Sequence, residues 1–283
     1  MRQLSSLQSV MKFSESARLT GTVAFVPTMG VFHEGHLSLM QKAKAECDVV
    51  IVSLFVNPLQ FGPKEDFNIY PRELSEDRKK TAAAGVELLW TPSEKELFPK
   101  GFQTRIEVNT LSQKWEGGSR PGHFHGVATI LAKFLHIVQP TRLYLGQKDY
   151  QQTRVIARML VDLHFKTKLR VLPTVREKDG LAMSSRNKRL SAEERGSAPM
   201  LYRALQAAEQ AVQAGERDSR AILQAAAAVL KTVPRMTIDY LALCDETDLN
   251  PLEQLVDQAV LLAAVKIGSL RLIDNLRLKT HFR

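Results

Sequence analysis

Two histidines, His33 and His36, are the residues of this 283-residue chain best suited to chemistry. They follow an apolar, β-branched run at residues 22–26 and a turn that contains Gly30, and an amphipathic pattern starts near Glu34. This order predicts a strand, a turn and a helix N-terminus, which present backbone N–H groups and a positive dipole end to an anion. Paired imidazoles can hydrogen-bond phosphate oxygens and stabilise charge as a pentavalent phosphorus centre forms. The stretch therefore predicts a phosphate site.

Zinc is the main alternative for two neighbouring histidines. The metalloprotease pattern needs histidines four residues apart with a glutamate after the first, and zinc needs a further ligand. Gly35 and His36 break that spacing, and no third ligand is marked. The three-glycine dinucleotide fingerprint, the P-loop and the Gly-x-Ser-x-Gly elbow are missing too, which argues against hydride transfer, P-loop kinase chemistry and serine hydrolysis.

Further polar residues follow other predicted strands, where parallel sheets place ligand contacts. Gln60 lies in the loop after the apolar run 49–56, and a polar stretch at 147–152 follows the run 142–146. A solvated loop or a helix cap would also explain them. The serines and arginine of residues 184–186 are partly freed for a ligand, because Ser191 already supplies the cap of the next helix. Hydroxyl and guanidinium groups of this kind suit a phosphate-rich ligand.

The elements that must position these residues alternate between strands and helices in the first part of the chain. This alternation predicts an α/β domain at residues 1–175, a Rossmann-like doubly wound parallel sheet of five or six strands. The rest, residues 176–283, predicts a smaller α+β domain that starts after a hinge near residues 174–180. The predicted strands are 22–26, 49–56, 86–90, 104–108 (an edge strand), 142–146, 169–172, 236–244, 259–267 and 270–278. The predicted helices start near 34 or span 73–84, 127–138, 155–163, 192–214 and 219–233, and residues 116–122 read as a flexible segment.

Composition narrows the class of protein. The chain is 44% apolar and 24% charged, and no apolar run is long enough to span a bilayer. Its first twenty residues do not resemble a signal peptide, so we expect a cytoplasmic protein with no membrane association, in which Cys47 and Cys244 are reduced, partly buried thiols. The net charge of +9 allows a nucleic-acid partner. The basic residues are scattered, however, which favours a polyanionic small substrate or simple solubility.

Six ordered motifs carry a family resemblance that extends over nearly the whole chain. His33-Glu34-Gly35-His36 is similar to the His-x-Gly-His signature of the nucleotidyltransferase superfamily that includes class I aminoacyl-tRNA synthetases. The full set resembles the pantothenate synthetase (pantoate–β-alanine ligase) family. Its motifs lie at residues 27–36, 55–61, 70–72, 121–124, 146–152 and 179–187.

The resemblance implies a two-step ligation. ATP and pantoate give pantoyl adenylate and pyrophosphate, and β-alanine then attacks the mixed anhydride to give pantothenate and AMP. The family uses Mg2+ and is a cytoplasmic homodimer whose Rossmann domain closes against the small C-terminal domain. A carboxylate is a poor acyl donor, so such a catalyst needs positive charge and orientation more than a nucleophile.

The resemblance also implies a role for each matching residue. Gln60 and Gln152 would hold the carboxylate and hydroxyls of pantoate, with Met29 lining that pocket between ATP and pantoate. Asp77 would help to hold Mg2+, and Arg120 and Tyr70 would serve a flexible rim and the second substrate. The implied ATP contacts are His33, His36, Lys148, Ser184, Ser185 and Arg186 at the phosphates and developing charge, Gly146 and Asp149 at the ribose, and Val175 and Met183 near the adenine.

Two alternatives remain on the sequence alone. One is another adenylyl- or cytidylyltransferase of the same superfamily, in which Gln60 and Gln152 would have no pantoate to hold. The other is a basic RNA-binding module. Leu145 and Gln147 stand where the family more often has Phe and Glu beside Gly146, a departure that concerns substrate packing and leaves the reaction intact.

Overall fold

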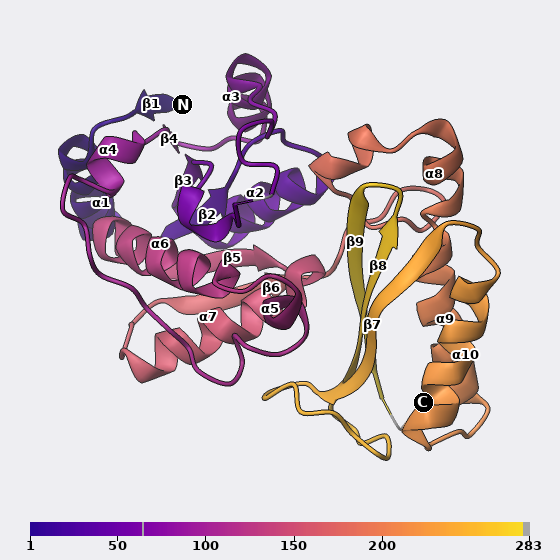
Figure 1. Cartoon of the computed structure of the whole chain (residues 1–283). Coiled ribbons are helices and arrows are strands. Elements are labelled where there is room, and N and C mark those ends of the chain that lie inside the picture. The colour runs from indigo at the N-terminus through magenta and orange to yellow at the C-terminus, as the bar shows by residue number, and fades with distance from the viewer. Residues whose placement is uncertain (64, 280–283) are drawn as a thin grey trace. The chain divides into compact units, whose positions relative to one another are not determined.

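The computed structural model describes residues 1–63 and 65–279, which form two compact units (Figure 1). The first unit consists of Met1–Gln147 and Gln151–Pro173, and the second of Lys148–Tyr150 and Thr174–Arg283. The last four residues of the predicted second domain lie outside the described part. The short segment Lys148–Tyr150 therefore packs with the second unit although it lies between two stretches of the first.

A six-stranded, fully parallel sheet forms the centre of the first unit, which confirms the predicted Rossmann-like α/β class. Its strands follow the order β1-β4-β3-β2-β5-β6. Their bounds are β1 (Arg2–Leu4), β2 (Val23–Thr28), β3 (Val49–Leu54), β4 (Leu88–Trp90), β5 (Arg142–Gly146) and β6 (Lys168–Leu172). The helices of this unit are α1 (Leu7–Thr20), α2 (Glu34–Glu46), α3 (Leu74–Ala83), α4 (Glu94–Leu97), α5 (Trp115–Ser119), α6 (His123–Val138) and nearly all of α7 (Tyr150–Asp162), with the short 3-10 helix η1 (Pro58–Gln60). A second 3-10 helix, η2 (Gln147–Asp149), falls largely in the Lys148–Tyr150 segment of the second unit.

The central strands of this sheet are covered on both faces, which explains their nearly continuous apolar sequences. In β2, Ala24 and Val26 belong to one buried cluster with Met40 of α2. Phe25 points the other way, and its ring lies 5.7 Å from that of Phe134 in α6. Alternate residues of one strand thus pack against helices on opposite faces, as a doubly wound sheet requires.

Two sequence predictions in the first unit are wrong. The expected edge strand at 104–108 is not a strand, because the Ile106 N–H donates to the Thr129 hydroxyl at 3.0 Å instead of to a neighbouring strand. The edge position beside β4 is taken by β1, close to the N-terminus. The segment 116–122, read as flexible, contains α5, in which Gly117 is required because an added Cβ would lie 1.9 Å from the Ser112 carbonyl oxygen.

The second unit combines an antiparallel sheet with helices, as predicted for an α+β domain. Its three strands form in the order β7-β8-β9, and each was predicted within two residues of its bounds. The predicted helix 192–214 is broken in two, because Pro199 has no N–H for a helical hydrogen bond and acts as the N-cap of the second piece. The elements are η3 (Ser185–Arg189), α8 (Ala192–Ser197), α9 (Met200–Gln213), α10 (Ser219–Lys231), β7 (Met236–Asp245), β8 (Ala259–Ile267) and β9 (Leu270–Leu278).

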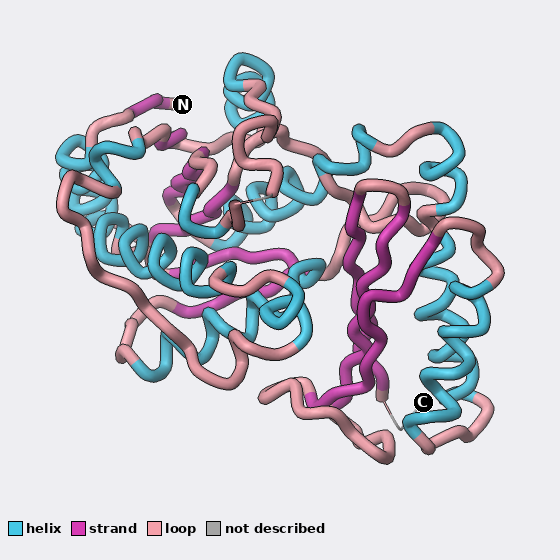
Figure 2. The backbone as a smooth tube through the Cα atoms, viewed as in Figure 1, coloured by secondary structure: helices cyan, strands magenta, loops and turns pink. Residues whose placement is uncertain are grey.

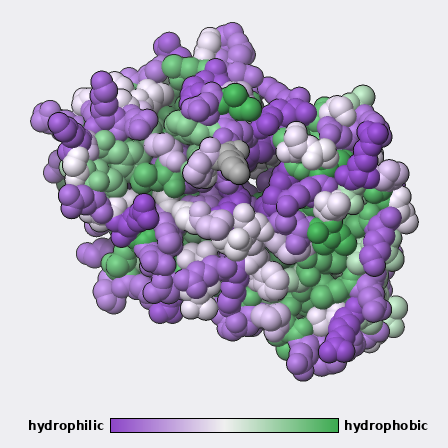
Figure 3. All heavy atoms as spheres, in the orientation of Figure 1, coloured by the Kyte–Doolittle hydropathy of each residue, from purple (hydrophilic) through white to green (hydrophobic). Residues whose placement is uncertain are grey.

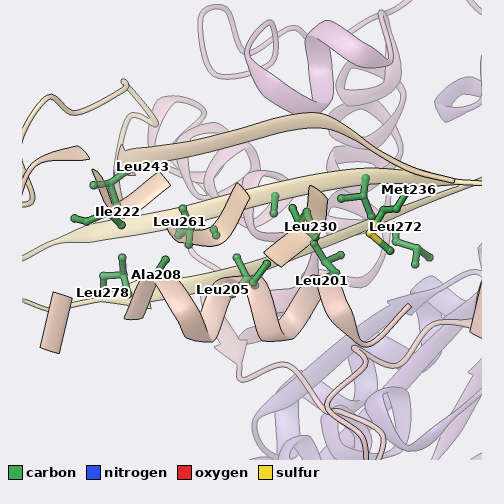
Figure 4. Packing of buried hydrophobic residues seen from close by; sticks show 14 of the residues in the cluster. Leu201, Leu205, Ala208, Ile222, Leu230, Met236, Leu243, Leu261, Leu272 and Leu278 are labelled. Atoms are coloured by element: carbon green, nitrogen blue, oxygen red, sulfur yellow. The ribbon is translucent and has the colours of Figure 1, made fainter. Parts of the chain in front are cut away.

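One hydrophobic cluster holds the second unit together. Side chains of α9 and α10, among them Leu205 and Ile222, pack against Leu261 of the sheet (Figure 4). Alanines such as Ala208 and Ala226 are fully buried and allow the two helices to approach closely. Figure 2 shows how the two long helices run beside the three strands of this unit.

Two further observations concern the surface and the cysteines. Hydrophilic residues cover much of the face shown in Figure 3, with hydrophobic ones between them. Within the described ranges, no helix has the length and apolar character that crossing a membrane requires. Cys47 and Cys244 are both buried and form no disulfide.

Candidate active site

The topology of the first unit marks the place where a ligand is expected. From β2 the sheet extends through β3 and β4 to one side and through β5 and β6 to the other. The direction of strand addition therefore reverses between β2 and β5, and open α/β sheets bind ligands outside the carboxyl ends of the strands at such a point. Thr28 ends β2 and Gly146 ends β5, so the predicted motifs at 27–36 and 146–152 both begin there.

His33 and His36 form a reciprocal cap at the start of α2. The Nδ1 atom of His33 accepts a hydrogen bond from the Gly35 N–H at 3.2 Å, and the Nδ1 atom of His36 accepts one from the His33 N–H at 3.3 Å. The ring centroids are 4.1 Å apart. These bonds assign the proton of each neutral imidazole to Nε2, which makes Nε2 the donor nitrogen of both rings. The pair is thus oriented at a helix N-terminus, as the phosphate prediction requires.

The turn before His33 depends on Asp77, for which the family resemblance implies a Mg2+ role. The side chain of Asp77 is only 1% exposed. Its two oxygens accept the N–H groups of Val31 and Phe32 at 2.8 and 2.7 Å. Both oxygens thus face backbone donors instead of an ion, so this carboxylate does not fit the implied metal role. Among residues 1–63 and 65–279, moreover, no group of three or more His, Cys, Asp or Glu side chains is arranged to hold a metal ion.

Gln60 and Met29, predicted to share a pocket, are in contact. The Gln60 Nε2 group lies 2.9 Å from the Met29 sulfur, and its Oε1 atom accepts a hydrogen bond from Asn57 Nδ2 at 3.1 Å. Asn57 itself is 2% exposed and also donates to the Gly126 carbonyl at 3.1 Å. Sequence reasoning missed Asn57 as a site residue, although its position at the end of the β3 motif was the available signal. The amide of Gln60 is therefore held in one orientation beside the turn after β2.

The backbone carbonyl of Gln60 accepts a hydrogen bond from a side chain of α6. His123 Nδ1 donates to the Gln60 carbonyl at 2.8 Å, and Arg120 lies 3.2 Å from His123 Nε2. Burial, followed by the adjacent Arg120 charge, lowers the pKa of His123 from 6.5 to about 4, so the imidazole is neutral. Gly126 allows α6 to approach, because an added Cβ would lie 2.2 Å from the Leu59 carbonyl oxygen.

Arg120 and Tyr70, implied for a flexible rim, are both held in place in the structure. Arg120 forms a two-pronged ion pair with Glu65, with nitrogen–oxygen distances of 2.8 and 2.6 Å. Tyr70 is 5% exposed, and its ring lies 6.0 Å from that of Phe61. Both side chains therefore make contacts with other residues of the first unit.

Gly146 and Gln152 lie at the end of β5. Gln152 is half-buried in the first turn of α7. A Cβ added to Gly146 would meet nothing within 4 Å, so packing inside the protein does not explain this glycine. A glycine with open space at the carboxyl end of a central strand is suited to the close approach of a ligand.

Lys148 and Asp149 belong to the second unit. The Lys148 ammonium lies 3.6 Å from an Asp149 oxygen, and the Lys148 carbonyl accepts a hydrogen bond from Asn275 Nδ2 of β9 at 3.0 Å. The Tyr150 hydroxyl donates to the Glu246 carbonyl at 3.1 Å. The strands of the second unit, and not η2 alone, thus determine where this lysine is placed.

The remaining predicted ATP residues lie on one small hairpin and the 3-10 helix that follows it. Val175 and Met183 are brought opposite one another, because the Met183 N–H donates to the Val175 carbonyl at 3.0 Å. Ser184 caps η3 by accepting the Arg186 N–H at 3.3 Å. Ser191 caps α8 through the predicted capping box. The serine of the trio nearest the hairpin is thus also a cap, which sequence reasoning did not foresee.

A buried ion pair anchors this hairpin to the sheet of the second unit. Arg176 contacts both oxygens of Asp274, and one of these distances is 3.0 Å. The guanidinium also stacks over the Tyr202 ring at 3.7 Å. Asp274 is 4% exposed, and burial raises its pKa above the ordinary value despite this partner. Val175 therefore directly precedes a residue whose side chain is fixed by a largely buried ion pair.

The first unit, taken by itself, offers two oriented imidazole donors and a fixed amide. The second unit, taken by itself, offers an ammonium, two hydroxyls and a guanidinium. Both cysteines are buried in other parts of the fold, so neither supplies a nucleophile to these groups. The groups themselves can bind anions and stabilise developing negative charge.

Comparison with known proteins identifies relatives that match over the whole length of the chain. A pantothenate synthetase of Moorella thermoacetica is 46% identical over 99% of this chain and 100% of its own length. A pantothenate synthetase structure from Thermus thermophilus superposes with a TM-score of 0.93 at 46% identity, covering 98% of this chain and 99% of that one. A Francisella tularensis pantoate-beta-alanine ligase, complexed with beta-gamma ATP and beta-alanine, gives a TM-score of 0.82 at 35% identity, covering 98% and 97%.

The family model described as pantoate-beta-alanine ligase matches residues 1–277. This range includes the first unit, all but the last residues of the second, and every predicted site residue. With its sequence, its two-unit fold and its full-length relatives in agreement, the chain belongs to the pantoate-beta-alanine ligase family.

Proposed function

We propose that this protein ligates pantoate and β-alanine to pantothenate at the expense of ATP, through a pantoyl adenylate, releasing AMP and pyrophosphate. The observation that carries the proposal is the orientation of Gln60. Its amide is fixed by Asn57 and Met29 beside the turn that bears His33 and His36. This arrangement supports a proposed hydroxy-acid site beside a proposed phosphate site, and full-length membership of the family supports the pairing.

In the first step, a pantoate carboxylate oxygen attacks the α-phosphorus of ATP and pyrophosphate leaves. Gln60 and Gln152 hold the carboxylate and hydroxyls of pantoate, and Met29 separates them from the nucleotide. The Nε2–H groups of His33 and His36 donate to phosphate oxygens as negative charge develops there. Holding the two substrates in line supplies much of the rate, since no covalent enzyme intermediate is required.

Residues of the second unit complete the nucleotide site in this proposal. Lys148, Ser184, Ser185 and Arg186 neutralise the phosphates of ATP, because cations and hydroxyls match phosphate oxygens. Gly146 and Asp149 contact the ribose, and Val175 and Met183 contact the adenine. We further propose that residues 176–283 form the domain that closes over a site built on residues 1–175.

In the second step, the neutral amine of β-alanine attacks the acyl carbon of the mixed anhydride. The C–N bond forms, the bond to AMP breaks, and the amine loses a proton. Mg2+ would enter with ATP, since magnesium in nucleotide sites often has few protein ligands, and it would supply positive charge against the phosphates.

We also propose that the protein acts as a cytoplasmic homodimer. Three large apolar side chains are exposed near the edge strand β6: Val161 is 65% exposed, Leu163 51% and Val171 40%. An unpaired strand edge with apolar neighbours is suited to a second copy of the chain. Light scattering coupled to gel filtration tests this directly, and a monomeric mass at micromolar concentration would contradict it.

Isotope exchange tests the adenylation step. With Mg2+, ATP and pantoate but no β-alanine, we expect labelled pyrophosphate to enter ATP, and pure folded protein that shows no exchange would refute the adenylate. Gln60→Ala and Gln152→Ala should raise the KM for pantoate more than that for ATP. Gln41→Ala, at an exposed position on α2, is the matched control. Equal effects on both substrates would contradict the assigned pantoate roles.

A further inference from the structure

Helix α3 fixes the turn before His33 through two side chains, one helical turn apart. Asp77 accepts the N–H groups of Val31 and Phe32 at 2.8 and 2.7 Å. Lys80 Nζ donates to the carbonyl of the same Phe32 at 2.6 Å. The N–H and C=O groups of Phe32, which directly precedes His33, are therefore both bound from a single helix.

The turn that receives these bonds has an unfavourable backbone. Gly30 has a φ of 91° and Val31 a φ of 55°. Positive φ costs glycine little, but a β-branched residue such as valine rarely adopts it and does so only where the surroundings enforce it. Val31 is also 2% exposed, so water cannot take over as the partner of its N–H. The conformation thus needs a buried acceptor, and Asp77 is that acceptor.

We propose that Asp77 and Lys80 are positioning residues for the reaction, which hold the strained turn so that His33 and His36 meet the transferred phosphorus. The proposal rests on the proposed function, because it assigns these histidines to adenylyl transfer. His33 is fixed by the chain that leaves Phe32, and His36 is fixed through its bond to the His33 N–H. A shift of the turn therefore moves both imidazoles.

The same contacts separate this role from magnesium binding. The charge of Asp77 is already met by two N–H dipoles, and the Lys80 ammonium lies at the Phe32 carbonyl that Asp77 holds from the other end. A divalent ion there would have to displace backbone bonds and approach a like charge. Asp77 and Lys80 therefore bind the protein's own backbone, which explains both side chains without an ion.

Asp77→Asn is the direct test, because the amide keeps the size of the side chain but turns one acceptor into a donor. Glu76→Gln is the matched control, since Glu76 is exposed on the same helix and pairs with Lys79. We expect kcat of pyrophosphate exchange to fall on the order of 100-fold in Asp77→Asn, as for an ångström-scale misplacement, while both KM values change less than about threefold. The Mg2+ concentration for half-maximal rate should stay as in the wild type.

Amide hydrogen exchange of the peptide that contains Val31 and Phe32 provides a second measurement. It should accelerate in Asp77→Asn and not in Glu76→Gln. Because it needs no turnover, this measurement still tests the clamp if the wild type makes no adenylate, a result that would refute the proposed function alone. Three results for Asp77→Asn would each overturn the positioning role: unchanged amide hydrogen exchange of this peptide, a kcat within about twofold of that of Glu76→Gln, or activity restored by excess Mg2+.

Lys80→Met keeps the test decisive if Asp77→Asn does not fold. It removes one hydrogen bond to the Phe32 carbonyl, and we expect kcat to fall about fivefold with unchanged KM values. Lys79→Met, at an exposed position one residue earlier, should leave kcat unaltered. Equal kcat values in these two variants would refute the contribution of Lys80.

Discussion

Replacing His123 by asparagine removes a buried imidazole that holds the main chain of Gln60. In the folded protein the pKa of His123 is lowered to about 4 by burial and then by Arg120, against 6.5 in the unfolded chain. The unfolded chain therefore binds more protons between these values, so the stabilising contribution is complete above pH 6.5 and is lost as the pH falls toward 4. The difference of about 2.5 pH units, at 1.36 kcal/mol for each, amounts to about 3 kcal/mol.

Tryptophan fluorescence makes this effect measurable in the first unit alone, because the chain has two tryptophans, Trp90 and Trp115, and both lie there. Denaturant titrations from pH 7 to pH 4 should show that the advantage of the wild type over His123→Asn shrinks by about 3 kcal/mol. Carboxylates that titrate in the same range contribute to both proteins and cancel in the difference. His136→Asn, at an exposed position on the same helix, is the matched control.

If the difference in unfolding free energy between wild type and His123→Asn stays constant from pH 7 to pH 4, the proposed effect of the lowered His123 pKa is refuted. A constant difference would mean that the imidazole takes up its proton equally well in the folded and unfolded chains, and hence that burial and Arg120 do not exclude the charged form. The neutral Nδ1–H donor to the Gln60 carbonyl would then lose its physical basis.

Three further changes test other parts of the structure. Gly126→Ala places a Cβ 2.2 Å from the Leu59 carbonyl oxygen, and we expect a loss of about 1–3 kcal/mol in the unfolding free energy of the first unit; a wild-type denaturation midpoint would contradict it. Asn275→Ala removes the bond to the Lys148 carbonyl and should raise the KM for ATP about fivefold without changing that for pantoate, whereas equal KM values for ATP would exclude this support. Hydrogen bonding and ion pairing lower the pKa of Glu46 from 4.5 to about 2. Its charge therefore stabilises the fold fully above pH 4.5, and this effect is lost as the pH falls toward 2. Glu46→Gln should therefore flatten acid unfolding in that range, and an unaltered acid transition would refute the role of the charge.

Local patterns were sufficient to predict most elements. Runs of β-branched and apolar residues identified β2, β3 and β5, and the reciprocal side-chain bonds at Ser191 follow from residues three apart in sequence. Where a pattern was short, local reasoning failed. The alternation at 104–108 was compatible with a strand, but the edge beside β4 was taken by Arg2–Leu4, which no local signal near residue 104 indicates.

The candidate site, too, has contacts that the sequence motifs predicted and contacts that they did not. The motifs named Gln60 and Met29 correctly as neighbours, and the structure joins them through a direct contact. Asn57, His123 and Gly126 were not predicted for this place, since they act on Gln60 only as supports: Asn57 bonds its side-chain amide, His123 bonds its backbone carbonyl, and Gly126 leaves space. Such roles have no residue-type signature, because any donor of the right reach, or any absent side chain, can fill them.

For the two histidines, the sequence by itself determined the residue types, the turn and the helix that begins with them. Spacing along the chain is enough for this, because a strand, a glycine turn and a helix start are local structures. The assignment of Nε2 as the donor of both imidazoles also follows from local bonds, within residues 33–36. The tertiary structure decided that Asp77 holds the backbone ahead of them and that Lys148 packs with the second unit. These two features depend on contacts between residues far apart in sequence, whose partners are selected by the packing of the whole fold.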